Sequence, residues 1–272
     1  MLLTSNLKIT IGLLVISVMV IIAFLAPQIT WHPPLKTLVG KPFTPPNREY
    51  LFGTDDLGRD IYAQTIYGLR TSLIVGITSS LLAVIIGILI GAIAGYYGGI
   101  TDDILMRIAD LLFVIPPFFL ALLIVVIVGP ELTNIIIAIA ITSWAGIARI
   151  TRAQFLRVKE YPFVEAARAL GATSYRIMLI HILPNALYGV IPYIALQIGN
   201  NIFVEAGLGF LGLSDPNVPS LGRLLNLGQQ YLTMAWWIAT FPGIILAILI
   251  IGFNLLGDGL IEYFNPRIRR VG

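Results

Sequence analysis

The sequence predicts an all-α membrane protein with about six transmembrane helices. Two features of its composition support this fold class. Charged residues make up only 11% of the 272 residues and hydrophobic residues 57%, whereas soluble domains carry about a quarter charged residues. The mean hydropathy is +0.90. Because so little polar surface is available to cover a water-soluble globule, we expect a lipid bilayer to surround most of the chain.

Six apolar stretches approach the roughly 20 residues that a helix needs to cross the hydrocarbon layer. They lie at about residues 9–26, 73–97, 110–131, 132–148, 185–204 and 236–256. Pro27 ends the first stretch, which is either a retained anchor or a signal peptide. The lack of a small-x-small cleavage site after it favours the anchor. The third stretch contains the pair Pro116-Pro117.

The basic residues lie between the apolar stretches and predict the orientation of the chain. Most of the 17 lysines and arginines fall on the side that carries the N-terminus, the 149–176 segment and a tail with Arg267, Arg269 and Arg270. Cytoplasmic loops are enriched in Lys and Arg, so both termini are predicted to be cytoplasmic. Because no basic face is clustered, we expect no nucleic-acid partner.

The sequence lacks the motifs of several catalytic classes. No G-x-x-x-x-G-K-[ST] phosphate loop is present, and the one Gly-Lys pair, Gly40-Lys41, is followed by Pro42. Cysteine is absent, which excludes disulfides and thiolate sites. We therefore predict no catalytic residue, no metal site and no cofactor in this chain. His181 is either a proton relay or a structural residue near the membrane surface, and its isolation in an apolar run favours the second.

The segment between the fourth and fifth stretches carries signals for two helices. Pro162 can begin a helix, and Glu165 lies near the positive N-terminal end of that helix. Gly171 is a residue typical of a helix end. Thr173 or Ser174 can cap a second helix. Pro184 is expected to bend or end this second helix.

Helical spacing places Phe163, Ala167 and Leu170 on one predicted face of the first of these helices. The segment is either a plain connector or a surface to which a peripheral partner protein docks. It is longer than the other predicted cytoplasmic links and has two ordered turns. Length and order together favour a docking surface.

Acidic and basic residues also gather before the second stretch, in Asp55, Asp56, Arg59 and Asp60. They could form a solvated turn with a local ion pair, which contributes little to stability. They could also bind a carboxylate or amine of a substrate. We favour a structural role in which they hold the outer segment near the second stretch.

The docking segment resembles the EAA loop of permeases in binding-protein-dependent ABC importers. Glu165-Ala166-Ala167 is followed after three residues by Gly171, and after nine more by His181, then Ile182 and the pair Leu183-Pro184. The histidine in place of the usual isoleucine is typical of the peptide branch of the family. Other similarities are to dipeptide/oligopeptide permeases of the C type (DppC/OppC-like). They lie in residues 52–60, 67–73, 210–213, 254–260 and 265–267. Leu221 departs from the tryptophan that members often carry.

This resemblance implies a type I ABC importer transmembrane domain in the plasma membrane of a bacterium or archaeon. It implies an anchor and extracytoplasmic segment at 1–70, a permease domain at 71–265 with its coupling loop at about 157–185, and a cytoplasmic tail at 266–272. The implied ATPase-coupling residues are Glu165, Ala166, Ala167, Gly171, Leu183 and Pro184. The implied partners are a second homologous permease, two ABC ATPase subunits that bind ATP and Mg, and an extracytoplasmic solute-binding protein.

The implied function is to form half of a translocation pathway for di- or oligopeptides, with no ATP hydrolysis by this chain. Oligosaccharides or nickel are alternative substrates for the same machinery. An ATP-independent channel or carrier is an alternative of a different class. The near absence of ionisable residues in the apolar stretches argues against an ion-coupled carrier. The sequence assigns no residue to substrate binding.

Overall fold

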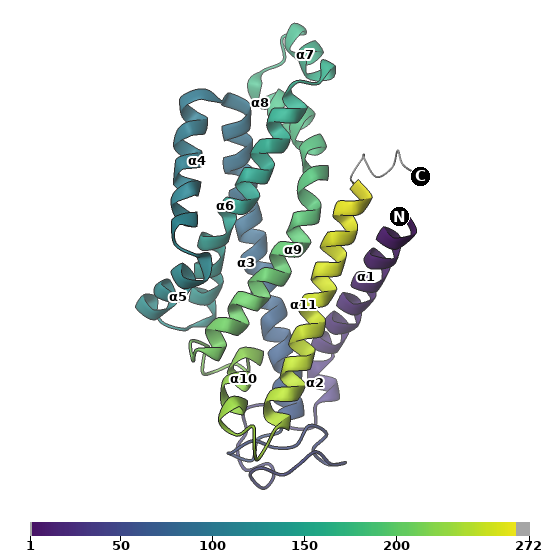
Figure 1. Cartoon of the computed structure of the whole chain (residues 1–272), viewed down its shortest axis with the longest axis vertical. Helices are drawn as coiled ribbons and strands as arrows, with labels where there is room; N and C mark the ends of the chain where they lie inside the picture. The colour runs from purple at the N-terminus through teal and green to yellow at the C-terminus, as the bar shows by residue number, and fades with distance from the viewer. Residues whose placement is uncertain (1, 265–272) are drawn as a thin grey trace.

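Long helices run side by side along the longest axis of the molecule (Figure 1). The computed structural model describes the backbone of residues 2–264 and the side chains of residues 6–264. The helices are α1 (Leu2–Phe24), α2 (Ala26–Ile29), α3 (Ile61–Tyr97), α4 (Gly99–Val114), α5 (Pro117–Val128), α6 (Leu132–Lys159), α7 (Pro162–Ala169), α8 (Ser174–Arg176), α9 (Leu183–Phe210), α10 (Leu221–Gln230) and α11 (Trp237–Phe264). A π-helical segment, Ile177–Ile182, joins α8 to α9. The predicted all-α fold class is confirmed.

Five of these helices are long and apolar enough to cross a membrane, and α4 with α5 forms a sixth candidate that is bent by 82°. The third predicted span is therefore not one straight helix. Ile115 precedes a proline and is extended, at φ −100° and ψ 126°, which ends α4. Pro117 lies in the first turn of α5, where its missing N–H leaves no hydrogen bond unmade. The two prolines thus convert the span into two helices with an elbow.

The helices extend beyond the apolar stretches that predicted them. The second span was expected to start at residue 73, but α3 begins at Ile61 and has 37 residues. The cause is a cap: the Asp60 carboxylate accepts hydrogen bonds from the backbone N–H groups of Tyr62, at 2.9 Å, and Ala63, at 3.5 Å. Hydropathy detects only the part of a helix that crosses the hydrocarbon layer. The backbone hydrogen bonds of the helix continue into the polar residues on either side of that part.

Helices α3 and α6 pack closely through glycine. Gly87, Gly91 and Gly95 of α3 face α6, and a Cβ on Gly91 would lie 2.3 Å from the carbonyl oxygen of Ala148. Small residues four apart let two helix backbones approach in a membrane, where burial of apolar surface drives little association. This contact forms the centre of the bundle.

Hydrogen bonds between side chains link α3 to α9. The Asn201 amide of α9 donates to the hydroxyls of Ser79 and Ser80, at 3.0 and 2.9 Å. The Ser72 hydroxyl donates to the buried carboxyl group of Glu205 at 2.7 Å. Polar side chains inside a membrane bundle face one another because lipid offers them no partner.

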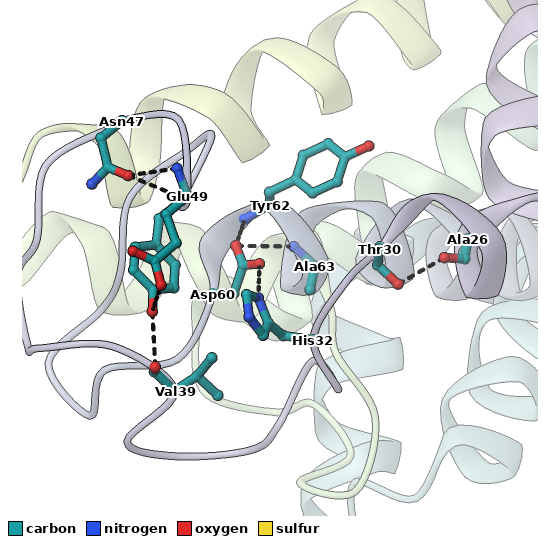
Figure 2. A network of polar contacts seen from close by, with 10 residues as sticks. Ala26, Thr30, His32, Val39, Asn47, Glu49, Asp60, Tyr62 and Ala63 are labelled. Atoms are coloured by element: carbon teal, nitrogen blue, oxygen red, sulfur yellow. Dashed lines mark hydrogen bonds and ion pairs between the residues drawn. The ribbon is translucent and has the colours of Figure 1, made fainter.

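Residues 30–60, which we call the outer segment, cover one end of the bundle. The Asp55 carboxylate is buried and accepts from the backbone N–H and side chain of Arg59, at 2.8 and 2.6 Å, and from Gln64 at 3.0 Å. Asp60 caps α3 and pairs with His32 at 2.9 Å (Figure 2). The indole N–H of Trp237 in α11 donates to the Thr54 carbonyl. Asp55 and Asp60 thus have the predicted structural role and are buried, whereas the Asp56 side chain is partly exposed.

The two ends of the molecule carry different elements (Figure 1). Helix α7 projects at one end, and the start of α1 and the end of α11 point toward that end. The outer segment and α10 lie at the opposite end. The predicted tail, with Arg267, Arg269 and Arg270, lies outside the described residues.

Candidate functional site

The first helix of the predicted docking segment forms as its capping signals indicate. Helix α7 begins at Pro162, with Glu165 in its first turn. It ends in a pair of hydrogen bonds, from Gly171 N–H to the Arg168 carbonyl at 2.9 Å and from Ala172 N–H to the Ala167 carbonyl at 3.1 Å. This bond pair is the Schellman motif, which needs a residue with positive φ at the turn. Gly171 has φ +76°.

The second helix continues into the membrane without an end at Pro184. Thr173 is the cap of α8 and accepts from the Arg176 N–H at 3.4 Å, as predicted. The chain then widens into the π-helical segment, in which Leu183 N–H bonds to the Met178 carbonyl, and continues as α9. Pro184 follows directly after the π-helical segment, so the hydrogen bond that a proline cannot make falls where the α-helical bonding pattern is already interrupted.

The three residues that were predicted to share one face of α7 differ in burial. Val164 is fully buried and Ala167 is 8% exposed, whereas Phe163 is 39% and Leu170 89% exposed. Only Ala167 of the predicted face therefore points inward. Val164 and Ala167 pack into a cluster whose other buried members are Ala92, Tyr96, Phe155, Val158, Ile177, Ile182 and Ala186. Helical spacing restricts which residues share a face, but the neighbours decide which face is buried.

The predicted coupling residues lie close together but differ in exposure. Glu165, Ala166 and Gly171 are exposed on the projecting loop, and Ala167 anchors it. Leu183 is half-buried against the α7 cluster, and Pro184 is exposed at the start of α9.

No hydrogen-bond or ion-pair partner of the Glu165 carboxylate occurs among the described residues. The loop therefore presents an unpaired carboxylate on a helix that Val164 and Ala167 hold to the bundle.

A second feature escaped the sequence analysis: two hollows on one face of α6 and α9. The larger, of about 450 Å³, lies between the cytoplasm-proximal parts of α6, α9 and α11 under the predicted orientation. The smaller, of about 190 Å³, shares Tyr193 with it. Their polar lining residues are spaced helically within apolar spans, as in Tyr193, Gln197 and Asn200. That spacing of neutral polar residues was the signal available in the sequence.

The bundle has the fold of the membrane-spanning part of ABC transporters. The MetNI methionine ABC transporter in an inward-facing form aligns with a TM-score of 0.57 and 22% identity, over 74% of this chain and 96% of that one. An amino acid ABC transporter solved with histidines aligns with a TM-score of 0.57 and 19% identity, over 74% and 94%. At this identity the likeness concerns the fold.

The sequence defines the family. Residues 87–270 match the model of the binding-protein-dependent transport system inner membrane component, and the chain belongs to this family. It is 38% identical to the oligopeptide permease protein OppC of Bacillus subtilis over 98% of this chain and 88% of that protein. It is 37% identical to the dipeptide permease protein DppC of the same organism, over 95% and 82%. The resemblance to C-type peptide permeases is thereby confirmed, and the chain is a membrane-embedded permease subunit.

Proposed function

We propose that this chain forms one half of the translocation pathway of an ATP-driven importer for di- or oligopeptides. A second homologous permease would supply the other half, and an extracytoplasmic solute-binding protein would deliver the peptide. Two ABC ATPase subunits would bind ATP and Mg. The two relatives described above are named as oligopeptide and dipeptide permease proteins. Their names support peptides as the substrate class over oligosaccharides or nickel.

The observation that carries the proposal is the exposed apolar surface of the α7 loop, at one end of the bundle. Leu170 is 89% and Tyr175 70% exposed, while Val164 holds the helix to the bundle. Exposed apolar side chains on a rigidly held helix mark an interaction surface for a protein. We infer that one ATPase subunit grips Glu165–Gly171, with Glu165 close to a basic group of that subunit.

The anchoring of α7 suggests how motion would reach the pathway. Val164 and Ala167 pack against Phe155 and Val158 of α6 and against Ile182, just before α9. Closure of the ATPases on ATP would displace α7 and, through this cluster, α6 and α9 together. Two arrangements with different contacts to nucleotide and solute are what alternating access requires.

This mechanism places the α7 end in the cytoplasm, with both termini, and the outer segment outside. The membrane would be the plasma membrane of a bacterium or archaeon.

Purification of the chain with the gene products encoded beside it tests the proposal. We expect a second permease and two ATPases to copurify, and the complex to hydrolyse ATP faster when peptide-loaded binding protein is added. The chain alone should not hydrolyse ATP, because it lacks a phosphate loop. Turnover by the chain alone, or peptide uptake without ATPase subunits, would contradict the proposal.

A further inference from the structure

The two hollows between α6 and α9 form one continuous face. Tyr193 of α9 lines both. From Asn185 to Asn200 the lining of α9 covers about 22 Å at 1.5 Å per residue. The hydrocarbon layer is about 30 Å thick, so this face occupies most of the depth of the membrane.

Several polar groups on this face have no hydrogen-bond partner among the described residues. They are the side-chain amides of Gln154 and Asn200 and the hydroxyls of Tyr188 and Tyr193. In the same helix α9, by contrast, the buried Asn201 amide is paired with two serines. Lipid cannot satisfy such groups, so water, a polar solute or polar groups of another subunit must meet them.

A glycine marks the open side of the same face. A Cβ on Gly146 of α6 would meet no atom within 4 Å, whereas a Cβ on Gly91 of α3 would meet three within 3.0 Å. Gly91 is thus used for close helix packing, and Gly146 is not used that way within this chain. The Gln154 amide lies across Gly189 of α9, where a Cβ would be 2.3 Å from its side-chain carbon. The absence of a side chain at Gly189 lets that amide face the hollow.

We propose that this face is the solute-contacting wall of the pathway and that Gln154, Asn200 and Tyr193 bind the main-chain peptide groups of the solute. This inference rests on the proposed function. An amide side chain carries one donor group and one acceptor, as a peptide group does, so the two pair in either direction. The wall is neutral apart from Arg157 at its α7 end. A neutral wall that binds main-chain groups accepts peptides of many sequences. Selection among peptides is then left to the binding protein.

Cysteine labelling tests whether the face is wet, and it needs no substrate. The chain has no native cysteine, so single variants report one position each. In the full complex, Asn200→Cys and Gln197→Cys should react with a charged, water-soluble thiol reagent about tenfold faster than Ile141→Cys, because the reactive thiolate forms poorly in apolar surroundings. Ile141 is 45% exposed and lies on the opposite side of α6 from Ile150. Equal rates in every nucleotide state would overturn the inference.

Uptake of radiolabelled trialanine tests the role of the amides. Gln154→Leu combined with Asn200→Leu keeps side-chain size and removes no hydrogen bond within the chain. We expect uptake per assembled complex to fall about tenfold, the effect of losing hydrogen bonds to a polar solute. Stimulation of the ATPase by loaded binding protein should remain. Ile141→Ala is the matched control and should transport normally.

The same variants separate a solute wall from a subunit contact. If the double variant no longer copurifies with the second permease, the face is a subunit contact and the inference is wrong. Gly146→Leu adds bulk at a position where a Cβ meets no atom of this chain within 4 Å, so it should block uptake in a complex that still assembles. Failure of the unmodified complex to take up trialanine would refute the proposed function, whereas uptake that is normal in both the unmodified and the variant complexes would refute only this inference.

Discussion

Gly171 determines the geometry of the α7 loop. Its φ of +76° lies in the left-handed region, and a Cβ there would meet no atom within 4 Å. Any other residue therefore strains the backbone, although its Cβ would not clash inside the chain. Any bulk at this position points to the surface on which the ATPase is proposed to dock. Gly171 is therefore both required for the positive φ of the turn and exposed on the loop surface.

Replacement of Gly171 by leucine tests that combination. The substitution costs on the order of 1 kcal/mol of backbone strain and adds bulk to the loop. We expect normal membrane abundance, a sharp fall in uptake per inserted permease, and loss of ATPase stimulation by loaded binding protein. Glu165→Ala, which removes one contact and leaves the turn intact, should give a milder defect.

Gly129→Leu is the matched control for the glycine. Gly129 also has a positive φ, +98°, and open space around its Cβ position, but it joins α5 to α6 away from the loop. Equal losses of uptake in the two variants would show that strain alone is responsible, and normal uptake with Gly171→Leu would make the loop a connector.

Asp55 is the residue on which the outer segment depends most. Asp55→Ala would leave Arg59, whose side chain is 11% exposed, without its main partner. Breaking a buried ion pair from one side costs about 3–5 kcal/mol. We expect a clear fall in the melting temperature of the complex in detergent. Asp56→Ala is the control, because its side chain is 25% exposed and its Oδ1 lies 3.8 Å from the Arg59 guanidinium, too far for a hydrogen bond. A similar fall in melting temperature for both variants would show that the outer segment does not depend on Asp55 more than on Asp56.

At the scale of elements, two kinds of contact hold the helices together. Glycines let α3 and α6 pack closely. Ion pairs connect α6 to α4, the helix that precedes the bend between α4 and α5. Arg152 binds Asp102 through two hydrogen bonds of 2.5 Å, and Arg149 binds Asp110. The two prolines then change the direction of the chain between α4 and α5, and α5 packs on α6 through Val125.

Gly91→Val tests the glycine contact. Its side chain would have to occupy space 2.3 Å from the Ala148 carbonyl oxygen, and overpacking of this kind costs about 1–3 kcal/mol. We expect reduced membrane abundance and a lower melting temperature. Gly243→Val in α11 is the control, since the nearest atom to its Cβ position is a leucine methyl group at 3.4 Å. Equal stability of the two variants would show that α3 and α6 can separate at no cost.

At the scale of the whole molecule, the two ends of the long axis carry different elements. One end carries α7 and the other the outer segment (Figure 1). The positive-inside rule selects which end is cytoplasmic, and the number of crossings follows from treating the bent pair α4–α5 as one passage.

Labelling from the two sides of the membrane tests this arrangement. Arg48 in the outer segment and Ser174 at the start of α8 are both exposed. Arg48→Cys should react with an impermeant reagent in intact cells, and Ser174→Cys only in inverted vesicles. The reverse pattern would invert the topology, and labelling of both from one side would exclude an odd number of passages between them.

The sequence by itself determined the features that depend on local signals. The apolar stretches predicted the spans, Pro162 and Gly171 predicted the limits of α7, and the spacing of the Glu165 motif predicted the family. These signals act within one or two helical turns or reflect the composition of the surroundings, so they can be read without the fold.

Only the tertiary structure decided which faces of the helices are buried and which remain open. Leu170 was expected to share a face with Ala167, yet only Ala167 is buried, because the cluster that receives Val164 and Ala167 comes from α3, α6 and the segment before α9. Likewise, the amides of Gln154 and Asn200 lie along one wall only because α6 and α9 pack side by side. Burial depends on contacts between segments far apart in the chain, and no local pattern encodes which segments will meet.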